Sequence, residues 1–298
     1  MSTLLPPAAP PRVAPTRTLR RLDWLGLAAL AVAALALYAP VLARLGAQWW
    51  TDETYSYGFL VPLFCAWLVW RRRGRLRTLA PRPARSGWWC VAGALAMLLV
   101  GRLGSELLMT RLSLLLMLTG LILVLAGRRW LRALAFPLCF LAFMIPLPVL
   151  IYNLATLPLE SVATRAGVAL VAWTGLPILR QGNLIALPAT VLDVVAACSG
   201  IRSLLALLAL GTAYGYLTEP GLGRRMILVA AMVPLAIVSN AVRIACTILL
   251  SFPLGAAASH GAWHQLTGLE VFVIAVVGLV LIQRLLHVRA PGKAASRA

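Results

Sequence analysis

The sequence predicts an all-α polytopic membrane protein, with about eight transmembrane helices, an outer-face amphipathic helix and a short extended segment. Of its 298 residues, 61% are hydrophobic and only 12% are charged, whereas soluble domains carry about 25% charged residues and are roughly half apolar. The formal charge is +19, but the arginines gather at the ends of apolar runs, as they do in cytoplasmic loops. We therefore expect the lipid bilayer, and no nucleic acid, to be the partner of this basic chain.

Eight apolar segments come close to the roughly twenty residues that a helix needs to cross a bilayer. They are residues 24–46, 55–70, 87–103, 107–126, 130–150, 199–217, 226–252 and 266–286. Arginine-rich stretches follow alternate segments, and with eight spans all of them fall on one side, while Asp52 and Glu53 fall on the other. The positive-inside rule then predicts a multi-pass protein of the inner (cytoplasmic) membrane with both termini in the cytoplasm.

The ends of the chain differ in composition from the membrane domain. Residues 1–22 are rich in proline and arginine, which is typical of a disordered cytoplasmic tail. The apolar run after Asp23 is longer than the 7–15-residue core of a signal peptide, so we interpret it as an uncleaved first span. The predicted organisation is therefore a tail (1–22), a membrane-embedded domain (23–288) and a basic cytoplasmic tail (289–298).

Residues 151–175 do not fit the alternating pattern, although they are mostly apolar. They contain Asn153, Glu160 and Arg165, and a ninth span here would place the later arginines outside. We expect instead a helix that lies at the outer face or dips into it. The stretch that follows, "LPILRQGNLIALPATVLDVV", alternates apolar and polar residues around a Gly-Asn pair, which predicts a short extended segment or hairpin.

Three residues on different predicted helices reach a similar height above the cytoplasmic side. At about 1.5 Å per residue, Cys198 lies roughly 31 Å above Glu219. By the same measure Arg243 lies roughly 27 Å above Arg225, and His264 roughly 30 Å above Arg284. The sequence therefore predicts that a thiol, a guanidinium and an imidazole share one depth near the outer boundary.

Cys198 is the cysteine best suited to chemistry. It precedes a predicted helix N-terminus, where backbone N–H groups and the helix dipole favour a thiolate, and Arg202 one turn further on adds to this effect. The remaining cysteines lie inside apolar runs and are expected to be packing residues: Cys65, Cys90, Cys139 and Cys246. The odd count of five predicts no disulfide framework.

Arg243 interrupts an apolar helix, where an arginine costs about 2.5–3.5 kcal/mol on insertion scales and usually faces a polar interior. Asn240, one turn below, favours such an inward polar face. His260 precedes His264 by one turn, and the pair could bind zinc with Cys198 as a third ligand. The spacing lacks the glutamate of a zincin motif, and His260 would project above the site, so we prefer His264 as a lone imidazole.

These residues, in this order, resemble the exosortase and archaeosortase family. The resemblance rests on "ACSGIRSL", "NAVRI" and "WHQLTGLEVF", and further upstream on "TDETYSYGFLVPLFCAWLVWRRR", "FMIPLP" and "RQGNLIALP", so it covers roughly residues 50–285. It implies that Cys198, Arg243 and His264 form a catalytic trio. We assign Arg202, Asn240 and Asp193 to supporting or substrate-binding roles. The chain departs from the family in its Ala196-Ala197 pair and in having no soluble domain after the last span.

The resemblance implies a cysteine transpeptidase-like enzyme that processes secreted proteins. Their C-terminal sorting signal would have a Pro-Glu-Pro-like motif, a transmembrane helix and an Arg-rich tail, and cleavage would occur near the motif at the outer face. Cys198 would attack the scissile carbonyl, His264 would act as general base and then acid, and Arg243 would hold the oxyanion or clamp a substrate carboxylate. No cofactor or metal is expected, and the acceptor stays open.

Three alternatives remain at this point. A zinc-dependent membrane protease would use Cys198, His260 and His264 as ligands. A transporter or polysaccharide-export component would use Arg243 as a charge for its substrate, but the sequence shows no internal repeat of the kind that accompanies paired broken helices. A purely structural membrane protein is the third.

Overall fold

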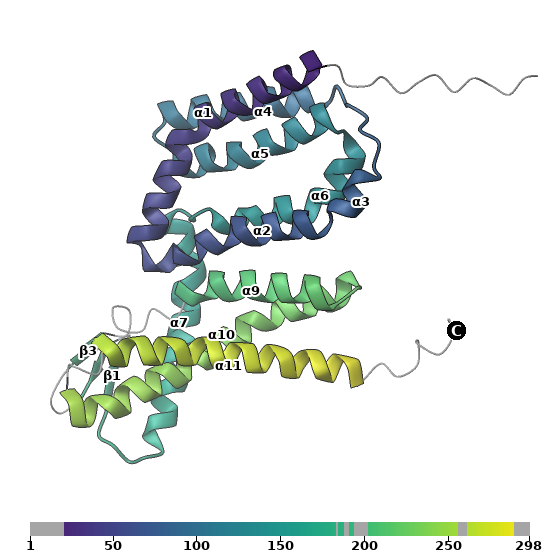
Figure 1. Cartoon of the computed structure of the whole chain (residues 1–298). Helices are drawn as coiled ribbons and strands as arrows, with labels where there is room; N and C mark the ends of the chain where they lie inside the picture. Colours follow the sequence, from purple (N-terminus) through teal and green to yellow (C-terminus); the bar gives the residue numbers. More distant parts are fainter. Residues whose placement is uncertain (1–20, 183, 188–190, 194–201, 256–260, 289–298) are drawn as a thin grey trace, which may run out of the picture. The chain divides into compact units, whose positions relative to one another are not determined.

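The computed structural model describes residues 21–182, 184–187, 191–193, 202–255 and 261–288, and this part of the chain is helical apart from one small sheet (Figure 1). The architecture confirms the predicted all-α polytopic class. Contacts divide the chain into two units, residues 1–44 and residues 45–298. The first unit contributes the start of helix α1 (Arg21–Thr51), whose apolar part exposes Val32 and Leu35, as a lipid-facing surface does.

Within the described residues, five helices are long and apolar enough to cross a membrane: Ala29–Thr51 of α1, α5 (Leu107–Leu125), α7 (Val149–Ala172), α10 (Leu222–Leu254) and Gly268–Val288 of α11. Helices α4 and α9 are apolar but shorter. Helix α2 follows the 3-10 helix η1, and α6 continues into the 3-10 helix η2, so that each pair forms a longer helical segment. The count of eight spans stays a prediction.

The bounds of the first helices of the second unit are η1 (Glu53–Phe59), α2 (Leu60–Arg71), α3 (Arg73–Arg77), α4 (Gly87–Leu103), α5 (Leu107–Leu125), α6 (Arg128–Phe140) and η2 (Leu141–Met144).

Helices α4 and α5 form a closely packed antiparallel pair, because small residues let their backbones approach. A Cβ atom on Gly87 would lie 2.8 Å from the Gly120 carbonyl oxygen, and one on Gly101 would meet Thr110. The turn between the helices contains Ser105 with a positive φ of 54°. This pair matches two of the apolar segments expected from the sequence.

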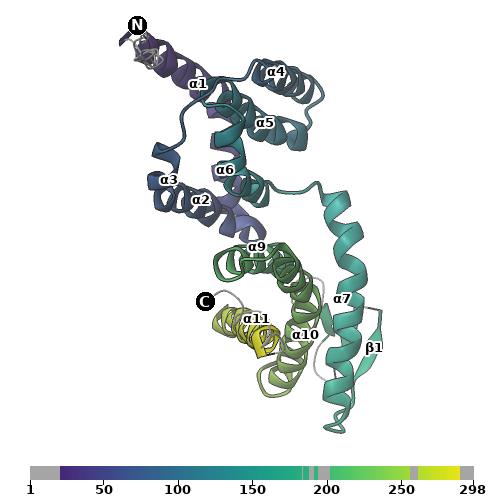
Figure 2. The same ribbon diagram turned by 90° about the vertical axis from the view of Figure 1, so that its right-hand side faces the viewer.

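Helices α9 (Arg202–Thr218), α10 (Leu222–Leu254) and α11 (Gly261–Val288) pack side by side (Figures 1 and 2). Their shared core contains Leu207, Leu228, Met232, Ala275 and Leu279, none of them more than 1% exposed. These side chains form the apolar core that precedes the polar residues Asn240 and Arg243 along α10.

Helix α7 (Val149–Ala172) runs across the direction of α9 and α11 in both views and packs on α10 (Figures 1 and 2). Its exposed residues include Leu150 and Leu154 but also Asn153 and Arg165, whereas Glu160 is buried. An amphipathic helix in the membrane interface turns its apolar face to the lipid. The burial pattern therefore agrees with both expected placements, at the outer face or dipping into it.

A three-stranded antiparallel sheet follows α7 and confirms the predicted extended segment. It consists of β1 (Leu179–Gln181), β2 (Leu184–Ala186) and β3 (Val191–Asp193). The structure adds a third strand to the expected hairpin, with Asp193 of β3 opposite Leu184 of β2. Ile185 is fully buried against Ile244 and Ile248 of α10, so the sheet is fixed to the outer part of that helix.

Candidate active site at the α7–α10 crossing

The structure locates some of the predicted site residues and not others. Cys198 and His260 lie outside the described residues. Arg202 is the first described residue of α9, Asp193 ends strand β3, and His264 lies in the first turn of α11. For these three, the structure gives the position of the backbone.

Arg243 and Asn240 are described with their side chains, and both are buried on α10. Arg243 is 8% exposed and Asn240 is 1% exposed. The Asn240 amide and the hydroxyl of the neighbouring Ser239 have no hydrogen-bond partner among the described residues. Buried polar groups of this kind are costly in a membrane helix and mark functional sites. The expectation that Arg243 faces a protein interior rather than lipid therefore holds.

The close approach of α7 explains why this part of α10 is buried. Gly167 of α7 packs on the backbone of Ala241 and the side chain of Ile244, and a Cβ atom on Gly167 would lie 2.8 Å from the Ala241 carbonyl oxygen. Two turns before Gly167, the buried face of α7 carries Glu160, which is only 4% exposed. The crossing thus buries a carboxyl group of α7 and a guanidinium of α10 in the same membrane-embedded region.

A small cavity of about 10 Å³ lies beside Asn240 and links three helices. Leu159 and Ala163 line it from α7, and Leu204 lines it from the first turn of α9. Its volume is close to that of a single water molecule. Since Leu204 and Asn240 share this cavity, the start of α9 lies one turn of α10 below Arg243. Cys198 precedes Arg202 by four residues and lies outside the described part of the chain.

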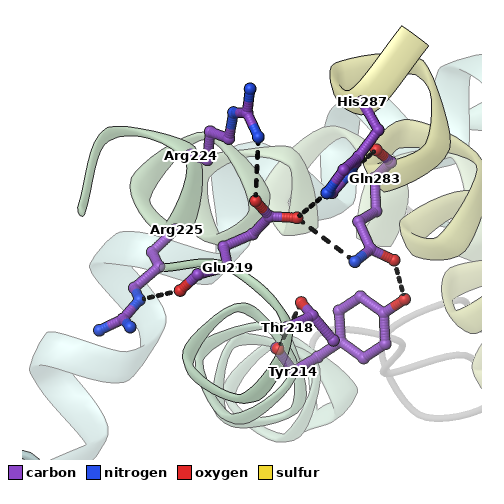
Figure 3. Close-up of polar contacts among 7 residues, drawn as sticks. All are labelled: Tyr214, Thr218, Glu219, Arg224, Arg225, Gln283 and His287. Carbon is purple, nitrogen blue, oxygen red and sulfur yellow. Dashed lines mark hydrogen bonds and ion pairs between the residues drawn. The ribbon is translucent and has the colours of Figure 1, made fainter. Parts of the chain in front are cut away.

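At the ends for which the sequence predicts a cytoplasmic location, the same helices are joined by a polar network around Glu219 (Figure 3). The Glu219 carboxylate, whose side chain is fully buried, lies 3.6 Å from Nη1 of Arg224 and 3.5 Å from Nε2 of His287. Gln283 donates a hydrogen bond of 3.3 Å from Nε2 to the same carboxylate and also bonds the Tyr214 hydroxyl. These contacts fix which residues of α9, α10 and α11 lie at one level.

Higher in the membrane, the register between α10 and α11 follows from two further contacts. Leu235 packs on Gly278, and Sγ of Cys246 donates a hydrogen bond of 3.5 Å to Oε1 of Glu270. Arg243 lies three residues inward of Cys246, and His264 lies six residues beyond Glu270 towards the start of α11. Nine residues of helix rise therefore separate Arg243 from His264 along the helix axes, which is about 13 Å. This register differs from the similar heights expected from helix rise, because those heights were counted from Arg225 and Arg284 separately and not from contacts between α10 and α11.

One buried carboxyl group, of Glu160, and one partly buried carboxyl group, of Glu270, were not assigned to the site from the sequence. Glu160 and Glu270 both interrupt apolar helices, and an ionisable residue in such a run is itself a signal of function. That signal was present in the sequence, but it gave no indication that Glu160 faces α10. Among the described side chains, no three histidine, cysteine, aspartate or glutamate residues lie close enough to hold a metal ion.

Comparison with known proteins identifies the family. Residues 49–281 match the family model described as transmembrane exosortase (Exosortase_EpsH). No curated protein and no solved structure matches the chain. The family match begins just before η1 and ends within α11, so it includes α7, α9, α10 and the residues that line their crossing. The protein therefore belongs to the transmembrane exosortase family, which consists of membrane protein-sorting enzymes.

Proposed function

We propose that this protein is a cysteine-type peptidase or transpeptidase that cleaves C-terminal sorting signals from secreted proteins at the outer face of the inner membrane. The observation that carries the proposal is the burial of Arg243 beside Asn240 on α10, next to the start of α9. The candidate nucleophile Cys198 precedes Arg202, the first described residue of α9, by four residues in the sequence. The substrate would be a protein with a Pro-Glu-Pro-like motif, a transmembrane helix and an Arg-rich tail.

The proposed reaction proceeds through a thioester. The Cys198 thiolate attacks the scissile carbonyl, the C–N bond breaks, and His264 delivers a proton to the leaving amine. In the second half, an acceptor amine or water gives up a proton to His264 and attacks the thioester, which releases the Cys198 thiolate. The atoms balance with either acceptor, so the same residues serve transfer and hydrolysis.

Arg243 would stabilise the negative charge that develops on the carbonyl oxygen. A cation in a water-poor site is worth more than one in water, and it needs no reorganisation during the reaction if packing already holds it. The packing of α7 on α10 would supply that support, and Asn240, one turn before Arg243 on the same helix, would orient the guanidinium or donate a further hydrogen bond. Clamping a substrate carboxylate is the other role open to Arg243.

The outward position of His264 suits contact with the side of the substrate peptide opposite to the side that Arg243 would contact. Since α11 begins at Gly261, His264 lies in the turn nearest the outer side, where a secreted substrate enters. An imidazole there meets the peptide from the outer side, while Arg243 meets it from within the protein. The long Arg243 side chain covers part of the axial separation between the two residues.

Co-expression with a substrate tests this function directly. A secreted protein with the tripartite signal is expected to be shortened by the parent enzyme and to stay full-length with Cys198→Ala or Cys198→Ser. Cys246→Ala is the matched control, because Cys246 lies three residues beyond Arg243 and binds Glu270. Full activity of Cys198→Ala, or loss of activity confined to Cys246→Ala, would refute Cys198 as the nucleophile.

A further inference from the structure

We propose that an apolar groove along α9 is the docking site for the transmembrane helix of the protein substrate; this inference rests on the proposed function. The groove has a volume of about 450 Å³. Tyr57 and Phe64 line it from η1 and α2, Ala206 and Ala213 from α9, and Phe272 from α11. None of its lining residues is charged.

The floor of the groove suits a helix. Ala206, Ala209 and Ala213 lie three and four residues apart and therefore share one face of α9. Small residues at this spacing allow the backbone of a second helix to come close, which is how helices associate in a bilayer. A polypeptide within the hydrocarbon has to be helical, because only a helix satisfies its backbone hydrogen bonds there.

Polar groups lie at the η1 end of the groove and distinguish a peptide from a lipid as its occupant. Ser56 and Tyr57 line this end, and the Tyr57 ring is close enough to Tyr152 for an electrostatic interaction between them. Hydroxyl groups here can bind the backbone that leaves a docked helix. Glu53, in the same 3-10 helix, is exposed and opposes the anionic headgroup of a phospholipid.

The groove also leads towards the candidate nucleophile. Ala206 is one turn from Arg202, the first described residue of α9, and Cys198 lies four residues before that. A substrate helix in the groove would therefore place the residues just beyond its outer end near Cys198. This is the position that the proposed cleavage requires, between a membrane helix and the secreted part of the substrate.

Beyond Ala213, α9 continues to Tyr216, which packs against aromatic and cationic side chains outside the groove lining. Phe136 of α6 stacks on Tyr216 of α9, with ring centroids 3.4 Å apart. The guanidinium groups of Arg72 and Arg225 lie 5.1 Å and 4.8 Å from the centroid of the same ring.

Photo-crosslinking from two adjacent residues of α11 tests the docking site. A photoreactive amino acid replaces either Phe272, which lines the groove, or Val273, which is 53% exposed and lies outside it. In a Cys198→Ser background co-expressed with a tripartite-signal substrate, position 272 is expected to capture the substrate at least tenfold more often than position 273. Equal capture at both positions, or capture of lipid alone at 272, would overturn the proposal.

A groove-filling substitution provides a second readout. Ala206→Phe is expected to reduce processing at least tenfold, whereas Val276→Phe, on the exposed side of α11, should leave it unchanged. Both variants have to insert to parental levels, and the 272 crosslink should fall in Ala206→Phe. If the parent processes the substrate but position 272 captures none of it, the docking proposal is wrong and the proposed function stands. If position 272 captures the substrate but the parent does not process it, the proposed function is wrong and docking in the groove stands.

Discussion

Sγ of Cys246 on α10 lies 3.5 Å from Oε1 of Glu270 on α11, and this contact sets the register of the two helices at the depth of the candidate site. Arg243 is one turn inward of Cys246, and His264 is nearly two turns outward of Glu270. The backbone positions of the two candidate catalytic residues therefore differ in height along the helix axes. In the proposed mechanism this would separate the residue that stabilises charge from the residue that transfers protons.

The register predicts a specific crosslink. With the other cysteines replaced by alanine, Glu270→Cys should be joined to Cys246 by a short bifunctional thiol reagent, because their side chains meet in the parent protein. Val273→Cys, almost one turn further along α11 and exposed, should not react in this way. A protease site engineered between α10 and α11 reports the crosslink. After cleavage, crosslinked protein keeps its two fragments joined on a denaturing gel, whereas uncrosslinked protein separates into them. Preferential crosslinking of Val273→Cys would mean that the register is wrong.

Arg243 should be the most sensitive residue of α10. Arg243→Gln is expected to lower the processing rate about 10²–10³-fold, the usual effect of losing one oxyanion donor. Asn240→Ala should have a smaller effect, since the guanidinium remains. Initial rates of substrate cleavage, normalised to membrane-inserted enzyme, measure both. If Arg243→Gln raises only the substrate concentration needed for half-maximal rate, Arg243 binds the substrate and does not stabilise the transition state.

The sequence predicted the class, the apolar segments and the extended segment because hydropathy and local turn chemistry decide them. It also placed Arg243 in a polar interior, since an unburied arginine in mid-helix is expensive. It could not place α7, because the side of α7 that faces α10 depends on the close approach of Gly167. Nor could it give the depth of His264, because that depends on where α11 meets Glu219 and Cys246. Contacts between distant residues set both features, and helix rise alone does not encode them.

The Glu219 network should contribute measurably to stability. Glu219→Gln keeps the shape but removes the charge that faces Arg224 and His287, so we expect a loss of about 1–3 kcal/mol, typical of a disrupted buried polar contact. Arg224 is partly exposed, so its guanidinium can turn to water, and Arg224→Gln should cost less than 1 kcal/mol. Thermal unfolding of the purified protein in detergent compares the two variants. Equal melting temperatures for Glu219→Gln and the parent would show that the network is dispensable.

The side of the membrane reached by each loop can be tested by labelling. Single cysteines in place of Arg75 and Arg128, and one near the C-terminus, should react only after the membrane is permeabilised, because the arginine distribution predicts a cytoplasmic location. Cysteines in place of Glu53 and Gln181 should react with an impermeant reagent in intact cells. Labelling of the 181 position from the cytoplasm only would show that α7 crosses the whole bilayer and would reject the eight-span arrangement.

The two histidines near the start of α11 distinguish a thiol enzyme from a metalloenzyme. A cysteine–histidine mechanism needs one imidazole within hydrogen-bond reach of the nucleophile, whereas a zinc site with Cys198 would use both His260 and His264. We therefore expect His264→Ala to abolish processing and His260→Ala to retain most of it. A chelator should have no effect, and a thiol-alkylating reagent applied from outside should inactivate the parent. Equal loss in both histidine variants, together with chelator sensitivity and zinc in the purified protein, would replace the thiol mechanism with a metal-dependent one.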